Sequence, residues 1–450
     1  MQYKLQYTHN LKGAQHKMNK KIIVVGADYA GLIAAALIAD KGFDVTLYEK
    51  RAESQLDNNT VETLNPDMLA LTGIGLPPND KWLSCDDPVI YCPSLSKEFH
   101  RTVPEKKRNI KIDSKDLFEH ILAFAKERPV DFRFGEAVIA PIIFGDRVAG
   151  VVTQSGKEDF ADLVIDCAGL GSPIKKALPQ SCGITKLCDT SYTYFTRTEN
   201  PLGKCPDEKR RIIIFPGGQK VIADINAGIR FTDVKITAFE PFTKLQNSEV
   251  LDYLRQFNPS IGDDVIASSC RKAPSDAPEL CPVCDGYAAA GFSAFMADPL
   301  SGETVTASLK AAKLLAKAVG KDRQCAFSKE TLWQYNCDYF KVAGINYALL
   351  DCVKKALLSM SDDEIDSLFE SGALNDSDFC ADAERPFSGA DINSLSLKLK
   401  AAKASPELFK KLAPFAAKAA AVRAILAAMP QKYNPSYFDL WQKSLKKAIG

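Results

Sequence analysis

KIIVVGADYAGLIAAALIADKGFDVTLYEK, residues 21 to 50, is the stretch of this sequence that decides the fold. It opens with a short β-branched run, Ile22 to Val25, of the kind found in strands that are buried on both faces. Gly26 ends this strand, a helix follows from about Tyr29 to Lys41, and a second strand from Val45 to Tyr48 leads to Glu49. This order predicts a β-α-β unit of the type that binds a dinucleotide.

The start of this helix and the end of the second strand indicate which ligand is bound. A helix N-terminus presents free N–H groups and a positive dipole end to a pyrophosphate, and an acid after the second strand accepts a hydrogen bond from a ribose hydroxyl. Small or apolar residues and the acid fall on the long form of this fingerprint, at Gly31, Ala35, Gly42, Val45 and Glu49. The predicted cofactor contacts of this unit are Gly26, Ala27, Ala30, Gly31, Glu49 and Lys50.

Asp28 departs from this fingerprint. The pattern has glycine at that position, because the backbone must come close to the pyrophosphate. A carboxylate there adds a Cβ atom and a negative charge beside two phosphates. Either Asp28 turns outward and the nucleotide shifts slightly, or nucleotide affinity is weakened or lost.

Length and composition limit the class of protein. A chain of 450 residues is expected to form two or three domains, and 46% hydrophobic with 25% charged residues is ordinary for a globular protein. A net charge of +1 argues against a general polyanion binder, so no nucleic-acid partner is expected. No apolar run reaches the roughly 18 residues of a spanning helix, and thirteen scattered cysteines favour a reducing cytoplasm.

Periodicity along the chain predicts four regions. Residues 51–108 are irregular, a helix is expected from Asp113 to Arg128, and a β-meander surrounds Arg147 to Thr153. Residues 186–237 alternate as in an antiparallel sheet. The expected divisions are a disordered leader (1–20), a discontinuous dinucleotide-binding domain (21–185 with 270–325), an antiparallel substrate domain (186–269) and a helical C-terminal region (326–450).

Two further glycine-containing segments follow buried strands. The first is ADLVIDCAGLGSP, residues 161–173, where a strand runs into a glycine-rich turn and a short helix. Such a turn either closes over a dinucleotide or is a plain β-α turn that needs small residues. The second is GYAAAGFSAFMADPLSGE, residues 286–303, which precedes a helix from Thr304 to Val319.

With these segments in place, residues 21 to about 370 resemble the geranylgeranyl reductase family of FAD-dependent oxidoreductases, a family related to the electron-transfer-flavoprotein:quinone oxidoreductases. The run from Asp166 to Ser172 is similar to the family's Asp-Ala-Ser-Gly-x-Gly-Ser turn, and Asp298 to Glu303 is similar to its Pro-Leu-Thr-Gly motif beside the flavin ring. The resemblance implies an α/β fold of the p-hydroxybenzoate hydroxylase type, with a Rossmann-like FAD/NAD(P)-binding domain, an inserted antiparallel substrate domain and a helical C-terminal region. It further implies FAD contacts from Ala168, Gly169, Gly291, Asp298, Pro299, Gly302, Glu303 and Thr304.

The implied activity is reduction of a carbon–carbon double bond in an isoprenoid-like apolar substrate, or electron transfer to a quinone. NAD(P)H or a reduced protein would supply the electrons, and free N–H groups near Glu303 and Thr304 would stabilise negative charge on the reduced flavin. The sequence does not assign a catalytic proton donor.

Two more departures keep a second function open. Phe292 stands where the family has an aspartate that binds FAD, and Arg211 to Ile214 stand where the family has an aromatic pair. Together with Asp28, they allow a family member with weakened or lost FAD binding that acts as a binding or assembly subunit.

Cys281 and Cys284 form a lone C-x-x-C pair. Zinc would need a second pair of ligands, and the four histidines have no ligand spacing, so no metal is predicted. Buried thiols are the simplest interpretation, and a redox disulfide is the alternative.

The C-terminal region predicts helices. Ser361 and Glu364 form a capping box, and Ser405-Pro406 begins a basic amphipathic helix that Pro414 should kink or split. Such a helix lies on an anionic membrane or packs on the substrate domain. The expected location is therefore cytoplasmic, with a peripheral membrane contact as the alternative.

Overall fold

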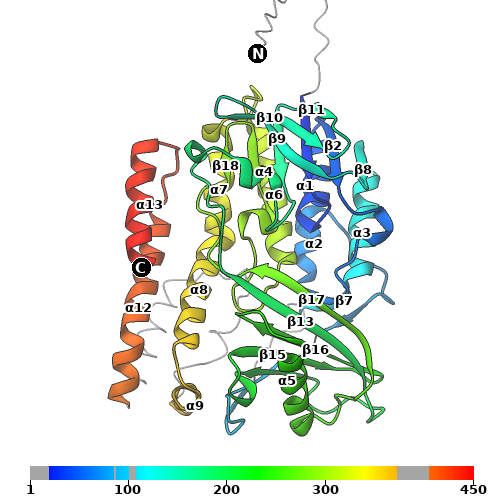
Figure 1. Cartoon of the computed structure of the whole chain (residues 1–450), viewed down its shortest axis with the longest axis vertical. Coiled ribbons are helices and arrows are strands. Elements are labelled where there is room, and N and C mark those ends of the chain that lie inside the picture. Colours follow the sequence, from blue (N-terminus) through cyan, green and yellow to red (C-terminus); the bar gives the residue numbers. More distant parts are fainter. Residues whose placement is uncertain (1–19, 86–87, 101–107, 372–404, 450) are drawn as a thin grey trace, which may run out of the picture.

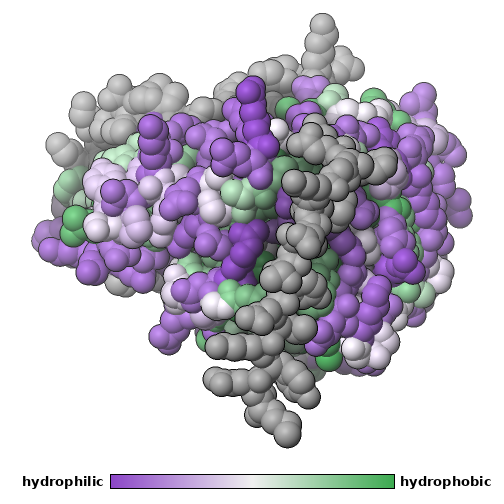
Figure 2. Space-filling view, turned by 90° about the horizontal axis from the view of Figure 1, so that it is seen from above, coloured by the Kyte–Doolittle hydropathy of each residue, from purple (hydrophilic) through white to green (hydrophobic). Residues whose placement is uncertain are grey.

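The computed structural model describes residues 20–85, 88–100, 108–371 and 405–449 of the chain. A parallel sheet with its helices occupies the upper half of the molecule in Figure 1, a large antiparallel sheet occupies the lower half, and long C-terminal helices run along one side. Residues 1–19 of the predicted leader lie outside the described residues. Figure 2 shows the molecule from above, where hydrophilic side chains predominate and hydrophobic ones appear in scattered groups.

The upper sheet contains the predicted β-α-β unit at its centre. Its strand order is β18 (Val283–Cys284), β19 (Tyr287–Ala289), β12 (Leu163–Asp166), β1 (Lys21–Val25), β2 (Asp44–Glu49) and β8 (Val130–Phe134). All neighbours are parallel except β18 and β19. Ile23 pairs with Thr46 on one side and with Val164 on the other, so β1 is a central strand and its apolar run is buried on both faces.

Helix α1 (Tyr29–Ala39) is buried on nearly all sides, which explains its small residues. It contacts α3 (Ser114–Lys126) and α6 (Val305–Lys321) as well as the sheet. A Cβ atom on Gly31 would lie 1.9 Å from the Gly26 carbonyl oxygen, so only glycine allows the helix to begin this close to the first strand. A meander of β9 (Val138–Phe144), β10 (Arg147–Thr153) and β11 (Glu158–Phe160) lies beside this unit.

The lower sheet contains the predicted antiparallel strands and has seven strands in all, with β5 and β14 as its one parallel pair among the described residues. Its order is β17 (Val265–Pro274), β13 (Thr190–Glu199), β16 (Phe231–Ala238), β15 (Val221–Ala227), β14 (Arg210–Ile214), β5 (Val89–Tyr91) and β6 (Glu98–His100). Helix α5 (Lys244–Phe257) buries Val250, Leu251 and Leu254 against Ile225 and Val234 in a core separate from that of the upper half.

Strands of the lower sheet lie across two of the predicted domain limits. The division at residues 269/270 cuts through β17, which pairs with β13 along its whole length from Val265 to Pro274. Strands β5 and β6 lie in the range predicted for the dinucleotide domain, but β5 pairs with β14 of the lower sheet. The rest of that irregular region forms a small sheet of β3 (Val61–Leu64), β7 (Ile110–Asp113) and β4 (Trp82–Ser84), with α2 (Pro66–Thr72) nearby in the chain.

The C-terminal part is helical where it is described. It consists of α7 (Lys329–Tyr339), a π-helical turn at Phe340–Gly344, α8 (Ile345–Leu358), α9 (Asp362–Glu370), α12 (Pro406–Ala427) and α13 (Pro435–Ile449). The predicted capping box is confirmed, because Ser361 accepts from the Glu364 N–H and Glu364 accepts from the Ser361 N–H. The fold class predicted from the sequence is confirmed as well.

Pro414 does not split α12, which is one helix from Pro406 to Ala427. A proline removes one backbone donor and frees the carbonyl four residues before it, here that of Lys410. Both Pro414 and Lys410 are exposed, so water can satisfy the freed carbonyl group. The prediction of a split was therefore wrong.

Candidate functional site

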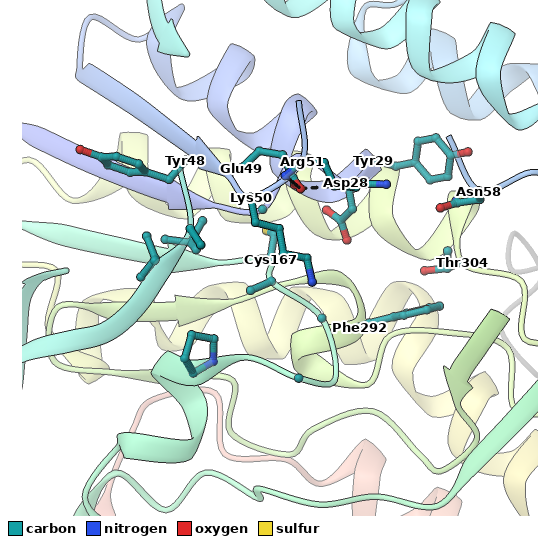
Figure 3. Close-up of a pocket in the computed structure, with 18 of the residues that line it drawn as sticks. Asp28, Tyr29, Tyr48, Glu49, Lys50, Arg51, Asn58, Cys167, Phe292 and Thr304 are labelled. Atoms are coloured by element: carbon teal, nitrogen blue, oxygen red, sulfur yellow. Dashed lines mark hydrogen bonds and ion pairs between the residues drawn. The ribbon is translucent and has the colours of Figure 1, made fainter. Parts of the chain in front are cut away.

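A cavity of about 430 Å³ opens where β1, β2 and β12 end. Parallel strands direct their carboxyl ends to one edge of a sheet, and ligands of such folds bind at that edge. Tyr48 lies at one end of the cavity, and Phe292 and Thr304 lie at the other (Figure 3). The predicted site residues Gly26, Glu49, Lys50, Ala168, Gly169 and Thr304 line it.

The first wall is the turn between β1 and α1. Gly26 has φ +103°, and a Cβ atom there would lie 2.3 Å from the Cys167 carbonyl oxygen. Glycine is therefore required, because the turn packs directly on the end of β12. Ala27, Ala30 and Gly31 support this wall from behind and do not line the cavity.

Glu49 ties this turn to the end of the second strand. Its Oε2 accepts from the Ala27 N–H at 2.7 Å, and its Oε1 accepts from the Arg51 backbone N–H at 2.9 Å and from Arg51 Nε at 3.0 Å. The residue is only 5% exposed. This buried carboxylate at the cavity surface is where the sequence predicts the acceptor for a ribose hydroxyl.

Asp28 faces the cavity as well, so the outward orientation considered for it is wrong. It is the N-cap of α1, and its Oδ1 accepts from the Gly31 N–H at 2.8 Å. Burial raises the pKa of Asp28 to about 7, since its hydrogen bond with Gly31 only partly offsets desolvation and the Glu49 charge adds to the rise. One N–H group of the predicted pyrophosphate site is thus taken by the protein's own carboxyl group.

The second wall is the glycine-rich turn after β12, held by the buried Asp166. Asp166 Oδ1 accepts from the Ala168 N–H at 3.0 Å and from Ser293 Oγ at 2.9 Å, and its Oδ2 accepts from Tyr287 at 3.0 Å. Ser293 in turn accepts from the Gly169 N–H at 2.8 Å. The network fixes this turn against the segment around Gly291. Cys167, Gly171 and Pro173 also line the cavity; they lie in the segment that the sequence pointed to but were not among the predicted cofactor contacts.

The far end is formed by Phe292 and by Arg271, which comes from β17 of the lower sheet. The guanidinium carbon of Arg271 lies 5.3 Å from the centre of the Phe292 ring. Sequence analysis missed Arg271, because an arginine in an alternating strand carries no local signal. Asn58, Ala137 and Val138 were missed for a similar reason, since only the folded chain brings them to the cavity, whereas Tyr29 and Arg51 adjoin predicted residues in the chain and were not named.

The predicted motif from Asp298 to Thr304 reaches the cavity only through Thr304. Asp298 closes its own turn by accepting from the N–H groups of Leu300 at 2.8 Å and Ser301 at 3.0 Å. Pro299 is buried, and a Cβ atom on Gly302 would lie 3.1 Å from Thr193 in the lower sheet. Gly291 also stays behind the surface.

Sequence analysis predicted free N–H groups at the start of α6, but one of them is not free. Glu303 Oε1 accepts from the Val305 N–H at 2.7 Å. Burial raises the pKa of Glu303 to about 8, and the nearby Glu62 charge adds to the rise. The expected stabilisation of a reduced flavin by this helix therefore cannot rely on the Val305 N–H while Glu303 caps it.

The C-x-x-C pair lies away from the cavity. Cys281 and Cys284 are buried at the edge of the upper sheet, and both are free thiols. Cys284 interacts with the Cys182 thiol, an interaction that lowers the pKa of Cys182 and raises that of Cys284. Among the described residues, no group of three or more Cys, His, Asp or Glu is arranged to hold a metal ion.

The residues present fit a dinucleotide such as FAD along most of the cavity. Glycines stand where a Cβ atom would collide with neighbouring backbone, and a buried carboxylate ends the second strand. Backbone can approach a ligand closely at Gly169, which has φ +83°, and at Gly171, where nothing lies within 4 Å of an added Cβ atom. Among the described residues that line the cavity, Asp28 is the one at odds with a bound pyrophosphate.

Comparison with known proteins agrees with this geometry. Residues 24–56 match the model of the NAD(P)-binding Rossmann-like domain. The chain is 24% identical over 381 residues to a digeranylgeranylglycerophospholipid reductase of Methanoculleus marisnigri, covering 79% of this chain and 90% of that protein. The reductase of the same name from Haloferax volcanii is 28% identical over 163 residues, covering 36% of this chain and only 38% of that protein.

Solved structures share the fold. A geranylgeranyl bacteriochlorophyll reductase-like protein of Thermoplasma acidophilum superimposes with a TM-score of 0.71 at 15% identity, covering 88% of this chain and 99% of that one. A halogenase solved with FAD superimposes with a TM-score of 0.61 at 14% identity, covering 96% of each chain. The predicted resemblance to the geranylgeranyl reductase family is confirmed, and both sequence relatives are named as reductases, which agrees with the predicted oxidoreductase class.

Proposed function

We propose, from this resemblance, that the protein is a FAD-dependent oxidoreductase that reduces a carbon–carbon double bond in an apolar, isoprenoid-like substrate. The observation that carries the proposal is the cavity at the carboxyl edge of β1, β2 and β12, with the buried Glu49 on one wall and the turn around Gly169 on the other. This edge is where folds of this type hold a dinucleotide.

Different residues of the cavity would hold different parts of FAD. Glu49 would accept from the adenosine ribose, since a carboxylate oxygen that already accepts one hydrogen bond retains capacity for another. Gly169 and Gly171 would let backbone approach the ligand, and Phe292 and Thr304 would stand at the flavin end. When bound, FAD would supply hydride or electron transfer.

The substrate class follows from the names of the sequence relatives, both of which are reductases of a digeranylgeranyl lipid. Each double bond would take up two electrons and two protons and become a single bond. The electrons would come from NAD(P)H or from a reduced protein. Electron transfer to a quinone is the alternative reaction, and a product analysis separates the two.

The experiment has two stages. The visible spectrum of the purified protein, before and after addition of FAD, should show bound flavin. Protein reduced with dithionite without oxygen should then add two hydrogen atoms per double bond to a digeranylgeranyl glycerophospholipid, as measured by mass spectrometry. Bound flavin with an unchanged lipid mass would contradict the substrate class alone.

A second candidate is a binding or assembly subunit that has lost FAD, and Asp28 is the observation that favours it. A carboxylate in the pyrophosphate site repels phosphate of the same sign. If the protein contains no flavin and takes none up at any pH between 5 and 9, this second candidate replaces the first.

A further inference from the structure

Asp28 lies in the cavity wall, and Gly291 lies directly behind it, although the two belong to different loops. A Cβ atom on Gly291 would lie 2.8 Å from Asp28 Oδ2, while Asp28 Oδ1 accepts from the Gly31 N–H at 2.8 Å. The carboxyl group is therefore held between the start of α1 and the segment that begins with Gly291. It cannot leave the cavity wall without losing the cap of the helix.

The charged groups around Asp28 do not fully neutralise it, because the Arg51 charge lowers the pKa of Asp28 by less than burial and the Glu49 charge raise it. Glu49 ends β2, and Lys50 and Arg51 follow it. The Cys167 thiol follows β12, and Arg271 lies in β17. Arg51 is paired with Glu49 at 3.0 Å, and Arg271 is paired with Glu62 at 2.9 Å. No lysine or arginine in the described part of the chain forms an ion pair with Asp28.

The segment opposite Asp28 adds no charge either, because Gly291–Ala294 contains only glycine, phenylalanine, serine and alanine. The remaining titratable groups among the described lining residues are Tyr29, on the same helix as the cap, and Tyr48, at the opposite end of the cavity from Phe292. Burial already raises the pKa of Asp28 to about 7 in the protein alone. A pyrophosphate would expel water from the cavity and add negative charge, and both changes favour the neutral carboxyl group further.

We propose that Asp28 couples dinucleotide binding to the uptake of one proton, so that the site holds a pyrophosphate well only while Asp28 is a neutral carboxylic acid. The proton comes from solvent and is bound by the Asp28 carboxylate. This inference rests on the proposed function, because it assumes that FAD is the ligand. It makes Asp28 a residue that sets the pH range of cofactor binding.

The sign of the effect follows from linkage. Below the pKa of Asp28 in the free protein, the carboxyl group is already neutral and affinity does not depend on its titration. Above that pKa, binding must include proton uptake, so the affinity falls by about tenfold for each pH unit. The fall ends at the higher pKa of the complex.

Titration of flavin-free protein with FAD, followed by quenching of flavin fluorescence between pH 5.5 and 9, tests the proposal. The wild-type affinity should be level near pH 6 and fall by about tenfold per unit above pH 7. Asp28→Asn keeps an oxygen for the Gly31 N–H but carries no charge, so its affinity should stay level. Asp44→Asn, at the exposed opposite end of β2, is the matched control and should behave as the wild type.

Calorimetry of FAD binding in two buffers of different ionisation enthalpy measures the proton directly, and the wild-type measurement does not depend on any variant folding. About one proton should be taken up per FAD near pH 8 in the wild type. Tight FAD binding without proton uptake, and with level affinity, overturns the inference and leaves the proposed function standing. Absence of FAD binding at every pH overturns both.

Discussion

The guanidinium group of Arg271 meets the carboxylate of Glu62 with Nη1 2.9 Å from Oε1, and this pair joins the lower sheet to the small sheet beside the cavity. Arg271 also donates through Nη2 to the Gly302 carbonyl oxygen at 2.9 Å. Glu62 is only 3% exposed, and breaking a buried ion pair by removing one partner is strongly destabilising. The pair therefore helps to hold the far end of the cavity together.

Arg271→Gln should lower the free energy of unfolding by about 3 kcal/mol, because it leaves the buried Glu62 carboxylate without a cation. Glu62→Gln should restore much of this loss in the double variant, since it removes the unpaired charge. Urea unfolding of the wild type, the two single variants and the double variant measures the coupling free energy between Arg271 and Glu62. Lys272→Gln, the exposed neighbour on the same strand, is the control and should change little. A single variant Arg271→Gln as stable as the wild type would show that the pair contributes nothing.

Glu49→Ala should reduce FAD affinity by at least about tenfold, because hydrogen bonds to a charged group contribute about 1.5–3 kcal/mol each. It also removes the acceptor of the Ala27 N–H, so thermal unfolding must be recorded beside flavin content. Glu49→Gln keeps a carbonyl oxygen for that N–H, so its FAD affinity should lie between that of Glu49→Ala and that of the wild type. A folded Glu49→Ala protein with unchanged flavin content would contradict the proposal that Glu49 accepts a hydrogen bond from the ribose.

The stability of the flavin-free protein should depend on Asp28. Its pKa is about 7 in the folded protein and near 3.8 in an unfolded chain, so the folded state holds a proton that the unfolded state releases between these values. The contribution of this proton to the free energy of unfolding is fully present below pH 4 and is lost as the pH rises through 7. Asp28→Asn removes this dependence, so it should gain stability over the wild type by at most about 4 kcal/mol at pH 8 and by nothing at pH 4. Parallel stability curves of the two proteins across this range would contradict the raised pKa.

The chain from Ser405 onward should be needed for folding. Val422 and Leu426 of α12 and Trp441 of α13 are buried, α12 packs against α8, and Trp333 of α7 donates to the Pro430 carbonyl oxygen at 2.6 Å. A protein ending at residue 404 exposes these partners, so we expect it to aggregate or to unfold at lower temperature. Circular dichroism and size-exclusion chromatography would show either result.

Peripheral membrane contact stays a prediction for the same segment. Part of the apolar stripe of α12 is used inside the protein, whereas Tyr437 and Leu440 of α13 are exposed at 49% and 64% beside several lysines. None of the helices in the described ranges has the length and hydropathy to cross a membrane. Co-sedimentation of the full-length protein with anionic vesicles that weakens with salt would support the contact. Full-length protein that ignores such vesicles would rule it out.

The sequence by itself determined the β1-α1-β2 unit. Its signals are local, because an apolar run, a glycine turn, a helix with small residues and an acid after the second strand all lie within residues 21–50. The glycine positions follow from close contacts in the fold, such as that of Gly31 with the Gly26 carbonyl group. The capping box at Ser361 could also be predicted from the sequence, because both of its hydrogen bonds lie within one helical turn.

Only the tertiary structure decided how distant segments complete the cavity. It placed Asp28 against Gly291, turned Glu303 onto the start of its own helix, and brought Arg271 across from the lower sheet. It also joined β5 to β14 in a sheet whose other strands lie far along the chain. A residue pattern records how each segment buries its own side chains, but it does not record which partner covers them, because many pairings of strands and loops satisfy the same periodicity.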